Sequence, residues 1–147
     1  MAKRKMLNGS SIVSKLHLNL QDIEPLTQAQ RTFFDNYDTG KCQLLMGYPG
    51  TGKTFLSLYK AFNELVHGGT ELSQIVIVRS AVPTRDIGFL PGNLDEKSQV
   101  YELPYRKVCS ELFGRDDAYE ILVKHGIVRF MITSYVRGIT LDDCIVI

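Results

Sequence analysis

Short apolar runs bounded by turn residues recur along the chain, and they predict buried β-strands. The runs show no regular alternation with polar residues, which is typical of strands covered on both faces, as in a parallel sheet. They lie at residues 42–46, 74–79, 127–132 and 144–147, and the last is expected to begin a fourth strand.

Between these runs, apolar residues recur at the spacing of one helix face. Thr27 is the expected N-cap of the first helix, and Gly40 follows its expected end. An interior proline removes a hydrogen bond and clashes with the preceding turn, so we expect the third helix to be interrupted near Pro104. Glycines at 68–69 and at 126 are expected to stop the second and fourth helices. The predicted helices cover residues 28–38, 53–67, 95–113 and 116–125.

The alternation of strands and helices predicts an α/β fold, with a mostly parallel sheet and helices on both faces. A length of 147 residues is that of one ordinary domain. Residues 1–20 are polar, basic and rich in turn residues, so we expect a flexible lead-in to a domain at 21–147. Prolines and glycines in residues 80–92 predict a long loop there.

Residues 47–54 read Gly-Tyr-Pro-Gly-Thr-Gly-Lys-Thr, which matches the phosphate-loop (Walker A) pattern G-x-x-x-x-G-K-[ST] at every fixed position. Glycines allow the backbone to curl, so that successive N–H groups point at phosphate oxygens. Lys53 would place a positive charge at the β- and γ-phosphates, and Thr54 would offer its hydroxyl to Mg²⁺. The helix that follows would point the positive end of its dipole at the anion. The pattern, lying between a predicted strand and a predicted helix, therefore predicts a nucleotide-binding site.

Composition excludes several other classes of protein. The formal net charge is +1, so nucleic-acid contacts would have to come from local patches rather than from a global basic field. The three cysteines and three histidines are scattered without zinc-like spacing, so we expect neither a metal site nor a disulfide framework from them. No apolar run approaches the roughly 18 residues of a membrane span, and the start lacks the apolar segment of a signal peptide. We therefore expect a cytoplasmic protein without membrane partners.

Three segments of the chain resemble the PhoH-like family of P-loop ATPases, particularly the short forms that bacteriophages carry. They read GYPGTGKTFLSL from Gly47, IVRSAVPTRDIGFLPGNLDEK from Ile77, and SYVRGITLDDCIVI from Ser134. The resemblance runs from about Thr27 to the last residue, although the family usually has a proline where this chain has Ser80. It implies a RecA-like fold similar to the N-terminal core of superfamily 1 helicases, with ATP and Mg²⁺ as cofactors. It also implies a link to phosphate starvation and, if the chain is phage-encoded, action in the host cytoplasm.

The resemblance further implies roles for individual residues. Gln30 lies where related helicases place a glutamine that reads the adenine edge, and an exposed helix glutamine is the alternative. Arg79 and Arg85 match a region that touches the nucleic-acid backbone in helicase-like relatives, and ordinary ion pairs are the alternative. Tyr135 and Arg137 could stack on a base and hold phosphate of RNA or single-stranded DNA, and a plain turn is the alternative. The residues expected to contact ATP are Gly47, Tyr48, Pro49, Gly50, Thr51, Gly52, Lys53, Thr54, Phe55 and Gln30, with Lys53 and Thr54 as catalytic residues and Thr54 as the metal ligand.

In this family, the strand that reads CIVI here runs into an Asp-Glu pair, in which Asp holds the Mg²⁺ shell and Glu polarises the attacking water. The sequence ends at Ile147, immediately before that pair, and Asp142 and Asp143 precede the strand. We therefore expect a chain that cradles nucleotide but hydrolyses it inefficiently by itself, and its standing as an enzyme stays open. A small-molecule nucleotide kinase and a non-hydrolysing module that binds nucleic acid or a partner protein are the alternatives. Self-association also stays open.

Overall fold

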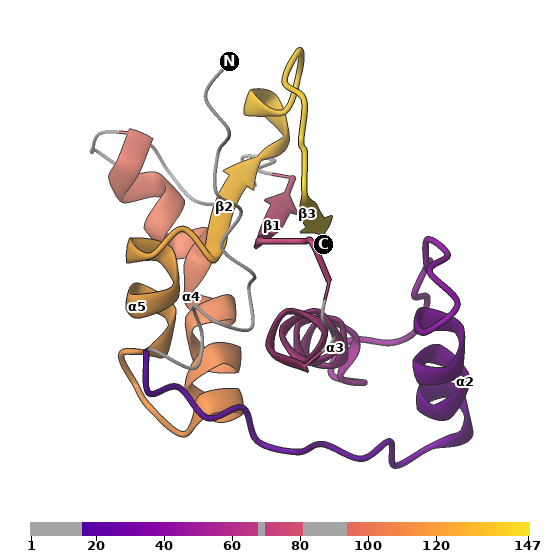
Figure 1. Cartoon of the computed structure of the whole chain (residues 1–147). Coiled ribbons are helices and arrows are strands. Elements are labelled where there is room, and N and C mark those ends of the chain that lie inside the picture. The colour runs from indigo at the N-terminus through magenta and orange to yellow at the C-terminus, as the bar shows by residue number, and fades with distance from the viewer. Residues whose placement is uncertain (1–15, 68–69, 81–93) are drawn as a thin grey trace.

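The computed structural model describes residues 16–67, 70–80 and 94–147, and its strands form one parallel sheet (Figure 1). The three strands are β1 (Gln74–Arg79), β2 (Val128–Ile132) and β3 (Cys144–Val146), in the spatial order β2-β1-β3. Both pairs are parallel, which requires crossover connections rather than hairpins. The predicted α/β fold with a parallel sheet is thereby confirmed.

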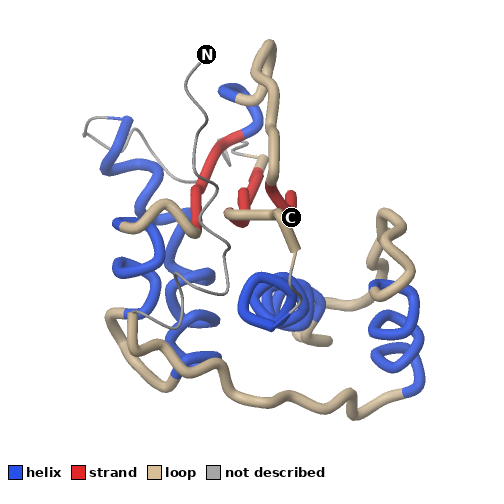
Figure 2. Tube along the Cα trace, in the orientation of Figure 1, coloured by secondary structure: helices blue, strands red, loops and turns tan. Residues whose placement is uncertain are grey.

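Four α-helices accompany the sheet in the described part of the chain, and Figure 2 shows them in blue. Helices α4 and α5 pack side by side, α3 packs against both β1 and α4, and α2 lies on the outer side of α3, away from the sheet. A 3-10 turn, η1, follows β2 directly. Within the described residues, no helix has the length and apolar character that a membrane crossing requires. The bounds are α2 Gln28–Tyr37, α3 Lys53–His67, α4 Leu94–Phe113, α5 Ala118–Lys124 and η1 Thr133–Tyr135.

The hydrophobic core lies on one face of the sheet. The register pairs Ile75 with Val128 and Ile77 with Phe130, so these four side chains point to the same face. Buried residues of α3, α4 and α5 pack against this face in one cluster, whereas Met131 is buried on the opposite face. The helical members of the cluster are Leu58, Tyr59, Ala61, Phe62, Leu65, Cys109, Leu112, Phe113, Ala118, Tyr119 and Leu122.

The helix ends confirm the caps expected from the sequence. Thr27 Oγ1 accepts from Gln30 N at 3.3 Å, and Gln30 Oε1 accepts from Thr27 N at 3.2 Å, which is a capping box. Gly40 and Gly126 follow α2 and α5 with φ of +72° and +71°, left-handed backbone that favours glycine. The glycines at 68–69, expected to stop α3, lie outside the described residues.

Residues 16–20, which the sequence assigns to the lead-in, pack onto the helices. Leu18 is only 3% exposed and belongs to the core cluster. Hydrogen bonds hold the next two residues to α4 and α3: Gln21 N donates to Leu112 O at 2.9 Å, and Tyr59 Oη donates to Asp22 Oδ1 at 2.9 Å. Figure 1 shows this indigo segment passing along the lower side of the helices to α2. The packed part of the chain therefore begins before residue 21.

The strand predicted at residues 42–46 is wrong. The structure shows this segment as loop (Figure 2), and Leu44 and Met46 are each 85% exposed. Cys42, expected inside a buried strand, is also exposed. The physical reason is that a strand needs a neighbouring strand edge, and this segment joins α2 to α3 on the side away from the sheet. Apolar composition alone does not supply that edge.

The interruption predicted in the third helix is also wrong, because α4 continues through Pro104. A proline at this position leaves the carbonyl of Val100 without its helical donor. Both Pro104 and Val100 are exposed, Val100 to 52%, so water can donate to that carbonyl instead. The helix therefore tolerates the proline on its outer side. The long loop predicted at residues 80–92, including Arg85, lies almost wholly outside the described residues.

Candidate nucleotide site

The predicted phosphate loop, residues 47–54, leads directly into α3, whose first residue is Lys53. Gly50 and Gly52 have φ of +77° and +81°, a left-handed backbone that L side chains rarely adopt. The first turn of the helix closes with Leu56 N donating to Gly52 O at 2.9 Å. The two glycines thus make the sharp turn that brings the loop backbone to the positive end of α3.

The ammonium group of Lys53 is held within this loop. Its Nζ donates to Gly47 O at 2.9 Å and to Tyr48 O at 2.7 Å, and it lies 3.3 Å from Thr51 Oγ1. Thr51 Oγ1 itself donates to Tyr48 O at 2.9 Å, which fastens the loop to itself. A phosphate oxygen at this place would receive the ammonium protons that the loop carbonyls now accept. The geometry therefore concentrates positive charge at one point of the loop.

Thr54 lies on the exposed side of the first turn of α3. Mg²⁺ prefers oxygen ligands, and it commonly takes one or two from the protein together with waters and substrate phosphates. A single exposed hydroxyl next to Lys53 at the start of α3 fits this pattern. Lys53, Thr54 and the loop backbone are therefore a donor set that suits a magnesium-bound polyphosphate.

A pocket of about 300 Å³ opens beside the loop. Ile23, Leu26 and Phe55 give it apolar walls, and Gly52 and Gln30 line its inner side. The amide nitrogen of Gln30 lies 3.9 Å from the position that a Cβ would take on Gly52. The structure thus brings Gln30, predicted from the resemblance, next to the loop, although 22 residues separate it from Gly52.

The orientation of the Gln30 amide is fixed by its backbone partners. Its Oε1 accepts from Leu26 N at 2.7 Å and from Thr27 N at 3.2 Å. Both partners are N–H donors, so the oxygen must face them and the Nε2 donor is turned toward the pocket. This capping role of Gln30 was not predicted, although Thr-x-x-Gln at the start of a helix is its sequence signal.

Two polar contacts hold α2 against α3 and so set the position of Gln30. Tyr37 Oη donates to Glu64 Oε2 at 2.7 Å, and burial raises the pKa of Tyr37, so it stays a neutral donor. Lys60 Nζ pairs with Asp38 Oδ1 at 2.7 Å. The same ammonium lies 5.1 Å from the ring centroid of Phe34, a cation–π distance. Side-chain contacts with α3, rather than contacts with the sheet, therefore hold the part of α2 that lines the pocket.

Comparison with known proteins identifies the family. The family model described as PhoH-like protein matches residues 22–147.

The chain belongs to the PhoH-like family.

Several curated members of the PhoH-like family are similar to this chain. The PhoH-like protein of Bacillus subtilis (strain 168) is 34% identical over 128 residues, which are 86% of this chain and 39% of the relative. The PhoH-like protein of Mycobacterium tuberculosis (strain ATCC 25618 / H37Rv) is 30% identical over 126 residues, 85% of this chain and 35% of the relative. Protein PhoH of Escherichia coli (strain K12) is 28% identical over 132 residues, 86% of this chain and 37% of the relative. The chain thus spans 35 to 39% of the length of these PhoH-like relatives.

The residues that the PhoH-like resemblance links to nucleic acid differ in their surroundings. Arg79 ends β1 but is engaged by α4, since its NH1 donates to Tyr101 O at 3.4 Å and its guanidinium lies 5.7 Å from the Tyr101 ring. Tyr135 and Arg137 lie beyond the carboxyl end of β2 and are exposed, Tyr135 to 52%. Among the described residues, no hydrogen bond or ion pair links these three side chains to the phosphate loop. Arg85 lies outside the described residues.

Proposed function

We propose that this PhoH-like chain binds ATP with Mg²⁺, placing the phosphates in the loop at 47–54 and the base in the pocket beside Gln30. One observation carries the proposal: the Lys53 ammonium is held at the centre of a loop that two left-handed glycines turn onto the start of α3. A positive helix end and a lysine charge at one point suit a polyphosphate. Membership in the PhoH-like family supports the same conclusion.

Binding would begin with an exchange of hydrogen-bond partners at Lys53. The γ- and β-phosphate oxygens would replace the carbonyls of Gly47 and Tyr48 as acceptors of its protons. Thr54 would hold Mg²⁺ through its hydroxyl, and the metal would supply positive charge beside the phosphates. The apolar walls of the neighbouring pocket would exclude water from the faces of the base.

The direct test is a calorimetric titration of the chain with ATP, ADP and adenosine in the presence of Mg²⁺. We expect ATP and ADP to bind and adenosine to bind much more weakly, because the phosphates meet the charge of Lys53. A lack of ATP binding up to millimolar concentration, or equal affinity for adenosine, would overturn the proposal.

The orientation of Gln30 predicts how the base is recognised. Its oxygen is occupied by two backbone N–H groups, so only Nε2 is available, and a purine offers N7 as an acceptor. We expect Gln30→Glu to keep the capping box but to weaken ATP binding about three- to tenfold, the worth of one hydrogen bond of about 0.5–1.5 kcal/mol. Competition titrations with ATP against the wild type and the variant measure this change.

A matched nucleotide separates this effect from general damage to α2. In 7-deaza-ATP a C–H group replaces N7, so the wild type should lose the same three- to tenfold while the Gln30→Glu variant should not distinguish the two nucleotides. If the wild type binds ATP and 7-deaza-ATP equally well, Gln30 does not donate to N7 and its role is limited to capping the helix.

We further propose that nucleotide binding is coupled to the binding of RNA or single-stranded DNA. The exposed Tyr135 and Arg137 favour this function, because Tyr135 ends η1 and Arg137 follows it by two residues, both beyond β2. An aromatic ring beside a guanidinium suits a stacked base with its phosphate. The described residues show no comparable feature that would support a nucleotide kinase.

Replacing Arg137 with alanine tests this coupling. We expect weaker binding of single-stranded RNA for every sequence, and a salt dependence flatter by about 0.7 in log K against log salt, the value for one lost phosphate contact. Fluorescence anisotropy at several salt concentrations measures both quantities. Arg31→Ala, at an exposed position on α2, is the matched control and should leave the slope unchanged. Superimposable curves for wild type and Arg137→Ala would remove Arg137 from any nucleic-acid site.

A further inference from the structure

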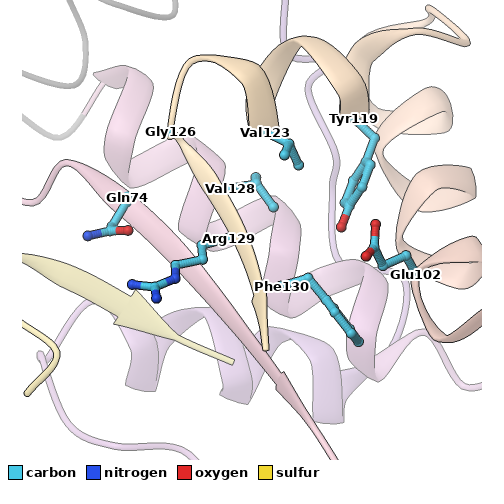
Figure 3. Close-up of a pocket in the computed structure, with 8 residues that line it drawn as sticks. All are labelled: Gln74, Glu102, Tyr119, Val123, Gly126, Val128, Arg129 and Phe130. Atoms are coloured by element: carbon cyan, nitrogen blue, oxygen red, sulfur yellow. The ribbon is translucent and has the colours of Figure 1, made fainter. Parts of the chain in front are cut away.

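A second cleft, of about 290 Å³, lies between α4, α5 and the outer edge of β2, and Figure 3 shows its lining. Val123, Val128 and Phe130 form an apolar wall, and Glu102 and Tyr119 bring polar groups to the same side. Its volume is near the lower limit of about 300 Å³ for small-molecule sites. None of these residues belongs to the nucleotide site described above.

Tyr119 carries a buried polar atom that the fold does not satisfy. The residue is 1% exposed, and within the described part of the chain its hydroxyl has no hydrogen-bond partner. Figure 3 shows this hydroxyl pointing toward the Glu102 carboxylate, from which it is not separated by another labelled side chain. Burial, and next the charge of Glu102, raise the pKa of Tyr119, so the group stays a neutral hydroxyl. An unpartnered buried hydroxyl costs about 1–3 kcal/mol, and a bound donor would lower this cost by giving the hydroxyl oxygen a hydrogen bond to accept.

Negative charge exceeds positive charge on the helical side of the cleft. The Arg106 guanidinium forms ion pairs with two carboxylates there, those of Glu102 and Glu120. It is hydrogen-bonded to Glu120, whereas Glu102 lies 3.6 Å away, beyond hydrogen-bond length. The Glu102 side chain is only 17% exposed, so water screens its charge poorly. Among the described residues, Glu102 therefore shares its ion-pair partner, Arg106, with Glu120, which leaves one positive charge for two carboxylates.

The other cation of the cleft, Arg129, points elsewhere. Its Cα pairs with Val76 of β1, which places its side chain on the sheet face opposite to Val128 and Phe130. Figure 3 shows its guanidinium directed toward Gln74 and away from Glu102. Arg129 therefore lines the rim of the cleft without neutralising its polar side.

We propose that this cleft binds an alkylammonium group, with the ammonium between Glu102 and Tyr119 and the alkyl stem against Val123, Val128 and Phe130. An ammonium has three N–H donors, enough for the carboxylate and the unpartnered hydroxyl together. Its aliphatic stem suits the apolar wall, as lysine stems do on protein surfaces. A carboxylate or phosphate ligand would instead be repelled by Glu102.

The alkylammonium has two chemical sources, a lysine side chain of a partner polypeptide or a free diamine. The edge of β2 distinguishes them. Ile75 N donates to Ile127 O, so in the parallel ladder Val128 and Phe130 turn their backbone groups to the outer edge. No strand formed by the described residues covers this edge. An extended peptide could pair with these groups while its lysine enters the cleft, whereas a diamine could not.

The test is an NMR titration of the ¹⁵N-labelled chain with three probes: acetyl-Ala-Lys-Ala-amide, its norleucine analogue without the ammonium, and 1,5-diaminopentane. We expect the lysine peptide to shift the amide signals of Tyr119, Val128 and Phe130, and the norleucine peptide to bind at least tenfold more weakly. Tighter binding of the lysine peptide than of the diamine supports a polypeptide source, and equal binding supports a free amine. If neither amine shifts these signals, or if the norleucine peptide binds equally well, the proposal is overturned.

Three substitutions locate the site. Glu102→Gln should weaken amine binding at least tenfold, and Tyr119→Phe about threefold. The Tyr119→Phe variant keeps the test decisive if Glu102→Gln fails to fold, since the hydroxyl it removes has no partner. Glu111→Gln, at an exposed position of the same helix, is the matched control and should bind as the wild type does. Unchanged amine affinity in both cleft variants would overturn the proposal, and ATP titrations of the same proteins report independently on the nucleotide site.

Discussion

Replacing Lys53 with alanine is expected to weaken ATP binding more than tenfold, which corresponds to a loss of about 1.4 kcal/mol or more. Lys53 is the ammonium that the phosphate loop holds at its centre, through the carbonyls of Gly47 and Tyr48. Hydrogen bonds to charged groups contribute about 1.5–3 kcal/mol each, and an ammonium meeting two phosphates makes more than one. Isothermal titration of both proteins with ATP and Mg²⁺ measures the difference.

The loss of binding should not be a loss of fold. In the described part of the chain, the Lys53 ammonium has its polar contacts within the loop, and Lys53 is not a member of the hydrophobic core. Circular dichroism and the thermal midpoint of the variant should therefore match the wild type. Lys107→Ala, at an exposed position on α4, removes the same charge from the chain and should leave ATP affinity unchanged. Equal losses in the two variants would mean that net charge, rather than the loop, governs binding.

Local signals in the sequence predicted most of the fold correctly. The bounds of α2, α3 and β1 depend on caps, glycines and apolar spacing within a few residues. The structure confirms those of α3 and β1, and α2 ends one residue before its predicted end. The phosphate loop is a contiguous motif whose pattern can be recognised without knowledge of the remaining chain. The role of Gln30 was predicted from the family resemblance, and its position beside Gly52 follows from the packing of α2 on α3.

Features that depend on tertiary contacts escaped prediction. The alkylammonium cleft joins Glu102, Tyr119 and Phe130 from three separate elements, and no spacing in the sequence links them. The tolerance of α4 for Pro104 depends on which side of the helix faces water. Apolar runs are ambiguous in the same way. Residues 42–46 and residues 74–79 are both short apolar runs, but only residues 74–79 pair with neighbouring strands and form a strand themselves.

The burial of two leucines can be compared by measuring how much each stabilises the fold. The sequence predicts that both Leu44 and Leu58 are buried, yet Leu58 is fully buried in the core and Leu44 is 85% exposed. We expect Leu58→Ala to lower the free energy of unfolding by about 2–5 kcal/mol, through lost burial and the cavity left behind. Leu44→Ala should change it by no more than about 0.5 kcal/mol, as is usual for surface positions.

Urea denaturation followed by circular dichroism measures both variants, and the identical chemical change makes each the control for the other. The thermal midpoints should separate in the same order, with Leu58→Ala well below the wild type and Leu44→Ala close to it. A loss of about 2 kcal/mol or more in Leu44→Ala would show that residues 42–46 are buried after all, as a fourth strand of the sheet requires. Equal stability of the Leu58→Ala protein and the wild type would contradict the packing of α3 on the sheet, and with it the support for the loop that begins this helix.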